Sequence, residues 1–174
     1  MDIQDRPLVI CHSDWGDDPY AMGKVLELFD DGALMQLVSS VGRWEGLMLF
    51  DTEELDDIEK DSPNTRRLET LLSIKGQVMP EPPARMASGM DTILTYARER
   101  RKIVALELHA SGSPDVIGYV LQVGGEEIRI DRYDPYGEGA GAEDIPRDSI
   151  TRVFCGGEAL EDIGLLIEHN KQHS

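Results

Sequence analysis

The chain has 174 residues, of which 40% are hydrophobic, and its formal net charge at pH 7 is −17. This excess of negative charge repels phosphate backbones and anionic lipid, which argues against general nucleic-acid or membrane binding and leaves basic partners or solubility as its explanation. The first ten residues are acidic and lack a long apolar run. We therefore expect no signal peptide and a cytoplasmic location of the bacterial type.

The sequence matches itself at an offset of 95 residues. Gly23-Lys24-Val25-Leu26 falls on Gly118-Tyr119-Val120-Leu121, and apolar class persists at many other positions with the same offset. A repeat of about 70 residues is too long for a solenoid unit and suits a small domain. We expect two tandem domains, 1–77 and 102–174, joined by 78–101. Because each alone buries little surface, the two should share an apolar contact.

Each copy is predicted to begin with two strands and a hairpin. Apolar runs predict these strands over 7–11 and 22–28 in the first copy and over 102–108 and 117–123 in the second. Gly23 and Gly118 stand at the same place in the second strand, where a small barrel needs a tight corner. Asp30-Asp31-Gly32 and Gly124-Gly125 then predict the hairpin turns, and the alternation around Ile130 predicts the third strand.

Two further short strands and a helix are expected to complete each copy. The loops at 42–46 and 137–141 differ in residue type between the copies, so separate functions could lie there. The fourth strand is expected over 47–50 and 142–145, and the fifth element contains Leu55 and Ile58 or Ile150 and Val153. Amphipathic patterns predict closing helices over 64–74, with Leu68 inward, and over 158–170, with Ile163 inward.

The connecting stretch is the part of the chain that is not acidic. Met79-Pro80-Glu81-Pro82-Pro83 predicts a stiff, extended spacer, and Ser88 is expected to cap a helix that ends at Arg101. The basic run Arg98–Lys102 suits the negative end of that helix and can pair with the acidic domains. A phosphate-binding patch is the alternative interpretation of the same run.

Five short strands with a glycine-marked second strand and an adjacent helix resemble the Sm-like small barrel. The segments 118–121 and 150–153 are similar to uncharacterised bacterial proteins of that shape. The resemblance implies a mainly β, α+β chain of two tandem Sm-like five-stranded barrels, each followed by a helix. RNA-binding Sm proteins use an Asp and an Asn around the third strand and an Arg-Gly pair near the fifth. Here 31–36 has no such Asn and Cys155-Gly156 replaces Arg-Gly, so no RNA-contact residue is carried over.

The sequence predicts no catalytic set, no cofactor and no metal site. Cys11 and His12 are neighbours in a predicted strand, so their side chains should point to opposite faces and should not meet. Cys11 and Cys155 stand at non-equivalent positions of the two copies, which predicts no disulfide framework. The residues His12, Asp14, Asp17 and Asp18 match no dedicated cation-binding loop.

Seven residues are predicted as partner-binding candidates. Trp15, Trp44 and Tyr136 are expected in loops, where aromatic side chains are least needed for a core and could anchor a partner. The acids Glu53, Glu54, Asp56 and Asp57 belong to the densest charge in the chain, residues 51–61. A solvated edge that discourages sheet aggregation is the simpler explanation of these acids, and a docking face for a basic protein is the functional one.

These observations favour a non-enzymatic protein-binding module or regulatory scaffold whose partner is another protein. Two alternatives stay open. The acids at 51–61 could mimic phosphate in an immunity-type inhibitor of a basic nuclease toxin. An RNA-binding Sm-like protein could instead grip RNA through Arg98–Lys102.

Overall fold

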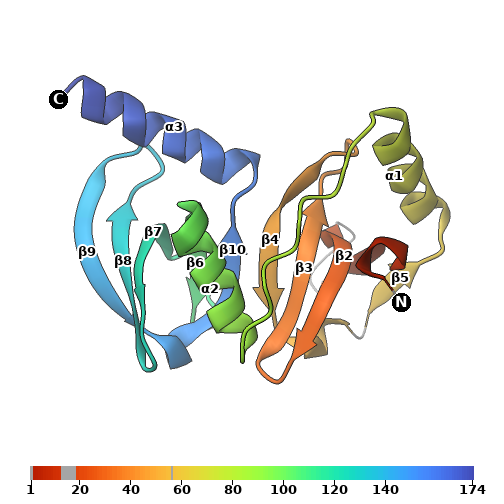
Figure 1. Ribbon diagram of the computed structural model, residues 1–174, viewed down its shortest axis with the longest axis horizontal. Helices are drawn as coiled ribbons and strands as arrows, with labels where there is room; N and C mark the ends of the chain where they lie inside the picture. Colours follow the sequence, from red (N-terminus) through yellow and green to blue (C-terminus); the bar gives the residue numbers. More distant parts are fainter. Residues whose placement is uncertain (1, 13–18, 56) are drawn as a thin grey trace.

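The computed structural model describes residues 2–12, 19–55 and 57–174, which form an antiparallel sheet and three α-helices (Figure 1). The first five strands are β1 (Val9–His12), β2 (Pro19–Phe29), β3 (Gly32–Val38), β4 (Trp44–Phe50) and β5 (Ile58–Lys60). The others are β6 (Ile103–Leu108), β7 (Val116–Val123), β8 (Glu127–Tyr133), β9 (Gly139–Pro146) and β10 (Ile150–Cys155). The helices are α1 (Pro63–Ile74), α2 (Gly89–Arg100) and α3 (Glu158–Gln172).

The prediction of two closed five-stranded barrels is wrong. The described strands form a single ten-stranded sheet in the order β5-β1-β2-β3-β4-β10-β6-β7-β8-β9. β4 pairs with β10, with Leu47 opposite Cys155 and Leu49 opposite Val153, so the edge of β4 that could close a first barrel is occupied by the second half. The sheet is therefore open, with β5 and β9 at its two edges, and the chain is mainly β with helices.

Strand pairing in the two halves of this sheet follows the same register. Val9 lies opposite Gly23 in the first half, and Val104 lies opposite Gly118 in the second, at an offset of 95. The β2–β3 pairing shifts between Val25 and Glu27, and the β7–β8 pairing shifts at the corresponding place, between Val120 and Gln122. The same local bend therefore occurs in both halves.

Glycine is required at the corner of β2 and of β7. A Cβ atom added to Gly23 would collide with the backbone oxygen of Gln36, and one added to Gly118 would collide with that of Asp131. The third strand of each half therefore passes directly over the glycine of the second strand. A side chain at either position would force the paired strands apart.

The closing helices dock as local sequence signals predict. Ser62 caps α1: its hydroxyl accepts a hydrogen bond from the backbone N–H of Thr65 at 3.1 Å, and Pro63 occupies the first helical position. α1 then buries Leu68 and Leu72 against β1 and β3. α3 buries Ile167 in the second half, where it contacts β6.

Helix α2 connects the two halves (Figure 1). Ser88 caps it as predicted, accepting from the N–H of Asp91 at 3.0 Å. Its first amides, those of Gly89 and Met90, also donate to the Asp31 carboxylate in the β2–β3 turn, at 2.7 and 3.0 Å. Fully buried side chains of α2 then pack in one core with residues from β3 and β4 of the first half and β7, β8 and β10 of the second.

An ion pair between Arg147 and Asp91 also fixes α2 to the second half of the chain. The Arg147 guanidinium lies 2.8 Å from an Asp91 carboxylate oxygen and also donates to the backbone oxygen of Gly124. This contact holds the pKa of Asp91 below its ordinary value. Because the pair keeps the carboxylate charged, its contribution to stability is present near neutral pH and is lost as acid protonates Asp91.

Apolar residues that correspond at the offset of 95 are buried to different extents. Met35 and Ile130 are both 0% exposed, so both members of that pair belong to a core. In three other pairs one member is buried and its counterpart half-buried: Val25 with Val120, Ile58 with Val153, and Leu68 with Ile163. Ile150 is buried, whereas the side chain of its counterpart Leu55 lies outside what the structure describes.

Among the described residues, no helix has both the length and the apolar character needed to cross a membrane.

The collision at the two strand corners predicts matched effects of substitution. Gly23→Ala and Gly118→Ala should each lower the free energy of unfolding by about 3 kcal/mol, because the added methyl group meets a backbone atom that cannot rotate away. Gly125→Ala is the control, since a Cβ there meets nothing within 4 Å, and its effect should stay within about 0.5 kcal/mol. Urea unfolding followed by circular dichroism measures all three. Equal stability of Gly118→Ala and Gly125→Ala would contradict the corner geometry.

Candidate functional site

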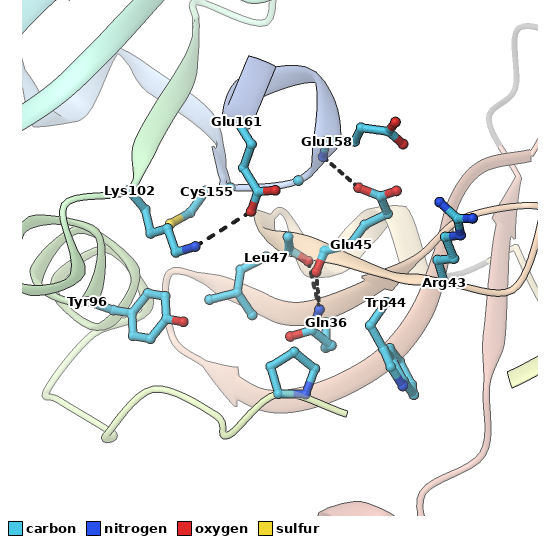
Figure 2. Close-up of a pocket in the computed structure, with 14 residues that line it drawn as sticks. Gln36, Arg43, Trp44, Glu45, Leu47, Tyr96, Lys102, Cys155, Glu158 and Glu161 are labelled. Carbon is cyan, nitrogen blue, oxygen red and sulfur yellow. Dashed lines mark hydrogen bonds and ion pairs between the residues drawn. The ribbon is translucent and has the colours of Figure 1, made fainter. Parts of the chain in front are cut away.

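The pairing of β4 with β10 creates a pocket of about 360 Å³ where the two halves meet, which we name the junction pocket (Figure 2). Strands β3 and β4, helix α2, and the turn from β10 into α3 all contribute to its wall. It is lined by Gln36, Arg43, Trp44, Glu45, Gly46, Leu47, Pro80, Tyr96, Lys102, Cys155, Gly156, Gly157, Glu158 and Glu161.

Glycines allow the two halves to meet closely beside this pocket. A Cβ atom added to Gly46 would collide with the backbone of Cys155 and Gly156, so β4 can approach the turn only with glycine there. Gly156 and Gly157 both have positive φ angles, 72° and 93°, which lead the chain from β10 directly into α3. Backbone geometry therefore defines this wall of the pocket.

Glu45 completes the wall by capping α3 across the junction. Gly157, at the N-cap position, has no side chain to accept from the first helical amides. The Glu45 carboxylate takes that role, accepting from the backbone N–H of Glu158 at 2.9 Å (Figure 2). The negative charge also faces the positive end of the helix dipole. A residue of the first half thus stabilises the helix of the second.

Gln36 is a buried polar side chain on the floor of the pocket, with 3% of its surface exposed. Its amide nitrogen donates to the backbone oxygens of Glu45 at 2.5 Å and Gly46 at 3.1 Å. Because these acceptors fix the nitrogen, the Oε1 atom must point the other way, toward the pocket (Figure 2). No side-chain or backbone group of the described residues donates to Oε1. An acceptor that faces the pocket and receives no donor from the protein is a natural contact for a donor on a bound group.

Two aromatic side chains flank the pocket. Trp44 is half-buried, and its indole N–H is buried without a hydrogen-bond partner among the described residues. The Tyr96 hydroxyl faces the amide of Gln36 across the pocket (Figure 2), and the Arg100 guanidinium lies 5.6 Å from the centre of the Tyr96 ring.

Charged groups surround the opening. The Lys102 ammonium lies 3.5 Å from a carboxylate oxygen of Glu161, and both side chains are about half-exposed. Arg43 supplies a second positive charge, while Glu45 and Glu158 bring the carboxylates to three. The pocket therefore carries one negative charge in excess, in keeping with the acidity of the whole chain.

Cys155 offers no reactive nucleophile to this pocket. Its side chain is buried, and burial raises the pKa of its thiol to about 12 despite the nearby Lys102 charge. The thiol is therefore protonated at neutral pH, and the thiolate that nucleophilic chemistry needs is not formed. The arrangement suits binding better than covalent catalysis.

A second hollow, of about 390 Å³, lies on the other side of the same wall, and we name it the junction groove. Residues 45–46 and 156–158 line both the groove and the pocket. Apolar side chains dominate the rest of the groove: Ala21, Met22, Leu37, Val38, Ala105, Pro114, Phe154, Ala159 and Leu160.

The predicted partner-binding residues do not form one site. Trp44 lies in the junction pocket, whereas Tyr136, 77% exposed, stands in the β8–β9 turn. Glu53 and Asp57 are exposed in the segment between β4 and β5, near the outer edge of the sheet. Trp15, Asp56 and the side chain of Glu54 lie outside what the structure describes.

The other candidate groups are used structurally where they are described. The ring of His12 lies 3.0 Å from the Glu59 carboxylate on the neighbouring strand, and Cys11 is fully buried. Asp14, Asp17 and Asp18 lie outside the described residues. Within the described part of the chain, no three His, Cys, Asp or Glu residues are placed to hold a metal ion together.

Sequence reasoning missed Gln36 and the inter-half contact of Glu45. Gln36 interrupts the otherwise apolar strand β3, and a polar residue inside such a run is a signal of a buried, hydrogen-bonded group. The Glu45 contact had no comparable signal, because its partner is 113 residues away in the chain.

Comparison of the chain with protein-family models, curated proteins and solved structures finds no match.

Removal of the Glu45 carboxylate should loosen the start of α3. Glu45→Ala is expected to lower the free energy of unfolding by about 1 kcal/mol, the usual effect of losing a helix cap. Amide hydrogen exchange should accelerate at residues 158–160 and change little in α1. Asp162→Ala, an exposed change further along α3, is the control. Unchanged exchange at Glu158 in Glu45→Ala would contradict the capping role.

Both cysteines should resist alkylation in the folded protein. Cys155 is buried with a thiol pKa of about 12, and Cys11 is 0% exposed. Iodoacetamide at pH 8 should therefore label neither residue on the timescale of minutes, and both should react once urea unfolds the chain. Mass spectrometry of the intact protein gives the count. Rapid labelling of Cys155 in the native state would show that the pocket exposes a reactive thiolate.

Proposed function

We propose that this chain is a non-enzymatic protein-binding module whose docking surface is the junction groove. The observation that carries the proposal is the apolar lining of the groove, to which both halves of the chain contribute. Met22, Leu37, Phe154 and Leu160 are each only half-buried there. A partner that covers these side chains would remove apolar surface from water, which is the main favourable term in protein association.

The chemistry of the junction supports binding over catalysis. The Cys155 thiol is protonated, the Glu45 carboxylate is engaged with a helix terminus, and the Glu161 carboxylate is paired with Lys102. The junction therefore combines apolar side chains with a polar rim, the composition typical of protein interfaces. Its excess negative charge favours partners with basic surfaces by raising the association rate.

The basic run is less suited to RNA binding than to its structural role. Arg98 and Arg100 lie in the last turn of α2, and Lys102 pairs with Glu161. These positions complement the negative end of the helix, as the sequence predicts. The immunity-type inhibitor remains the second candidate, because Glu53 and Asp57 are both exposed and could face a basic cleft.

We further propose that the chain arose by tandem duplication and works in the cytoplasm. The common register of the two halves at an offset of 95 supports the duplication. Two free, buried cysteines are compatible with a reducing compartment.

A photo-crosslinking amino acid placed in the groove tests the binding function. Benzoylphenylalanine at Leu160, which lines the groove, should form one discrete adduct with a protein in extracts of the native cell. The matched control is Leu165, on the same helix, 69% exposed and outside the groove lining. The adduct should disappear when Met22→Glu places a charge in the groove, and the identified partner should re-form the complex from purified components.

Three results of this experiment would count against the proposal. Equal labelling from Leu160 and Leu165 would show non-specific contact. Capture of RNA in place of protein would favour the Sm-like alternative, and a nuclease bound through residues 51–61 would favour the inhibitor.

A further inference from the structure

We propose that the junction pocket binds an arginine side chain of the protein partner. This inference rests on the proposed protein-binding function and names the chemistry that the partner presents. It starts from the Oε1 atom of Gln36, a residue only 3% exposed, whose amide nitrogen donates to backbone oxygens while Oε1 faces the pocket (Figure 2). The guanidinium group carries five N–H donors and no acceptor, so it matches an isolated acceptor of this kind.

The surroundings of Gln36 favour a cation over an anion. Glu161, Glu45 and Glu158 outnumber Arg43 and Lys102 around the pocket. The Lys102 ammonium lies 3.5 Å from a Glu161 carboxylate oxygen, and both side chains of this ion pair are about half-exposed. Such pairs contribute little, so the carboxylate can exchange its partner for a bound guanidinium. An anionic ligand would meet three carboxylates and would leave Gln36 Oε1 without a donor.

The shape of the pocket favours arginine over lysine. Trp44 presents aromatic surface at the pocket, and a planar guanidinium can stack on such a surface while it donates in its own plane. Lysine offers a compact charge without that planar match. The chain already uses this combination once, because Arg85 pairs with Glu27 while its guanidinium lies 4.8 Å from the centre of the Phe29 ring.

Titration with N-acetyl-L-arginine amide, followed by amide and indole NMR signals, tests the proposal. Saturable shifts are expected at the Trp44 indole N–H and at the backbone amides of Gly46 and Gly157. The dissociation constant should lie at about 1–10 mM, as is reasonable for a single side chain. N-acetyl-L-citrulline amide, which has nearly the same shape without the charge, and N-acetyl-L-lysine amide should each bind at least about fivefold more weakly.

Matched variants on α3 localise the effect. Glu161→Gln should weaken binding of the arginine probe about three- to tenfold, because it removes a carboxylate that lines the pocket. Asp162→Asn is the control, since that residue is the exposed neighbour and does not line the pocket. Neither change touches the buried core, so both variants should keep the spectrum of the folded protein.

The inference is overturned by any of four results. These are the absence of saturable shifts up to about 50 mM probe, equal binding of citrulline or lysine amide, shifts confined to residues 51–61, and equal effects of the two α3 substitutions. Failure here is distinguishable from failure of the binding function. A partner still crosslinked from Leu160 would keep the groove as a docking surface and remove only the arginine pocket.

Discussion

The burial of helix α2 between the two halves is the constraint on which the rest of the structure depends. Ile93, Leu94 and Ala97 are each 0% exposed, and their core contains residues from both halves. Asp31 of the first half holds the first amides of the helix, whereas its last residues lead directly into β6. Because one helix supplies core to both halves, neither can be completed without the connecting segment.

The pairing of β4 with β10 decides where a binding site can form. At the offset of 95, the outer strands β9 and β5 are the counterparts of that central pair. Phe154 lies opposite Met48 at the centre, but the corresponding residues at the outer edges are Glu59 and Glu143. Two apolar side chains favour pairing, whereas two carboxylates oppose it. The apolar match, and with it the pocket and the groove, is confined to the middle of the sheet.

Sequence reasoning succeeded where the signal was local and failed where two distant edges competed. Ser88 and the helix it caps were predicted because a cap and its helix are adjacent in the chain. The register at Gly23 and Gly118 followed from the repeat. Closure of each half into a barrel was the wrong expectation, because nothing local indicates that β10 takes the free edge of β4. The pocket was missed for the same reason, since Glu45 and Glu158 meet only after that pairing.

Acidity and site geometry have separate roles in the binding we propose. A net charge of −17 acts at long range and raises the encounter rate with basic partners, but it does not distinguish one such partner from another. Discrimination needs groups whose hydrogen bonds are satisfied only by the right ligand. Gln36 has this property: its amide nitrogen is fixed by two backbone oxygens, so its carbonyl oxygen cannot turn away from the pocket. A partner that supplies no donor leaves that acceptor buried and unpaired, and the resulting cost is the physical basis of selection at the junction.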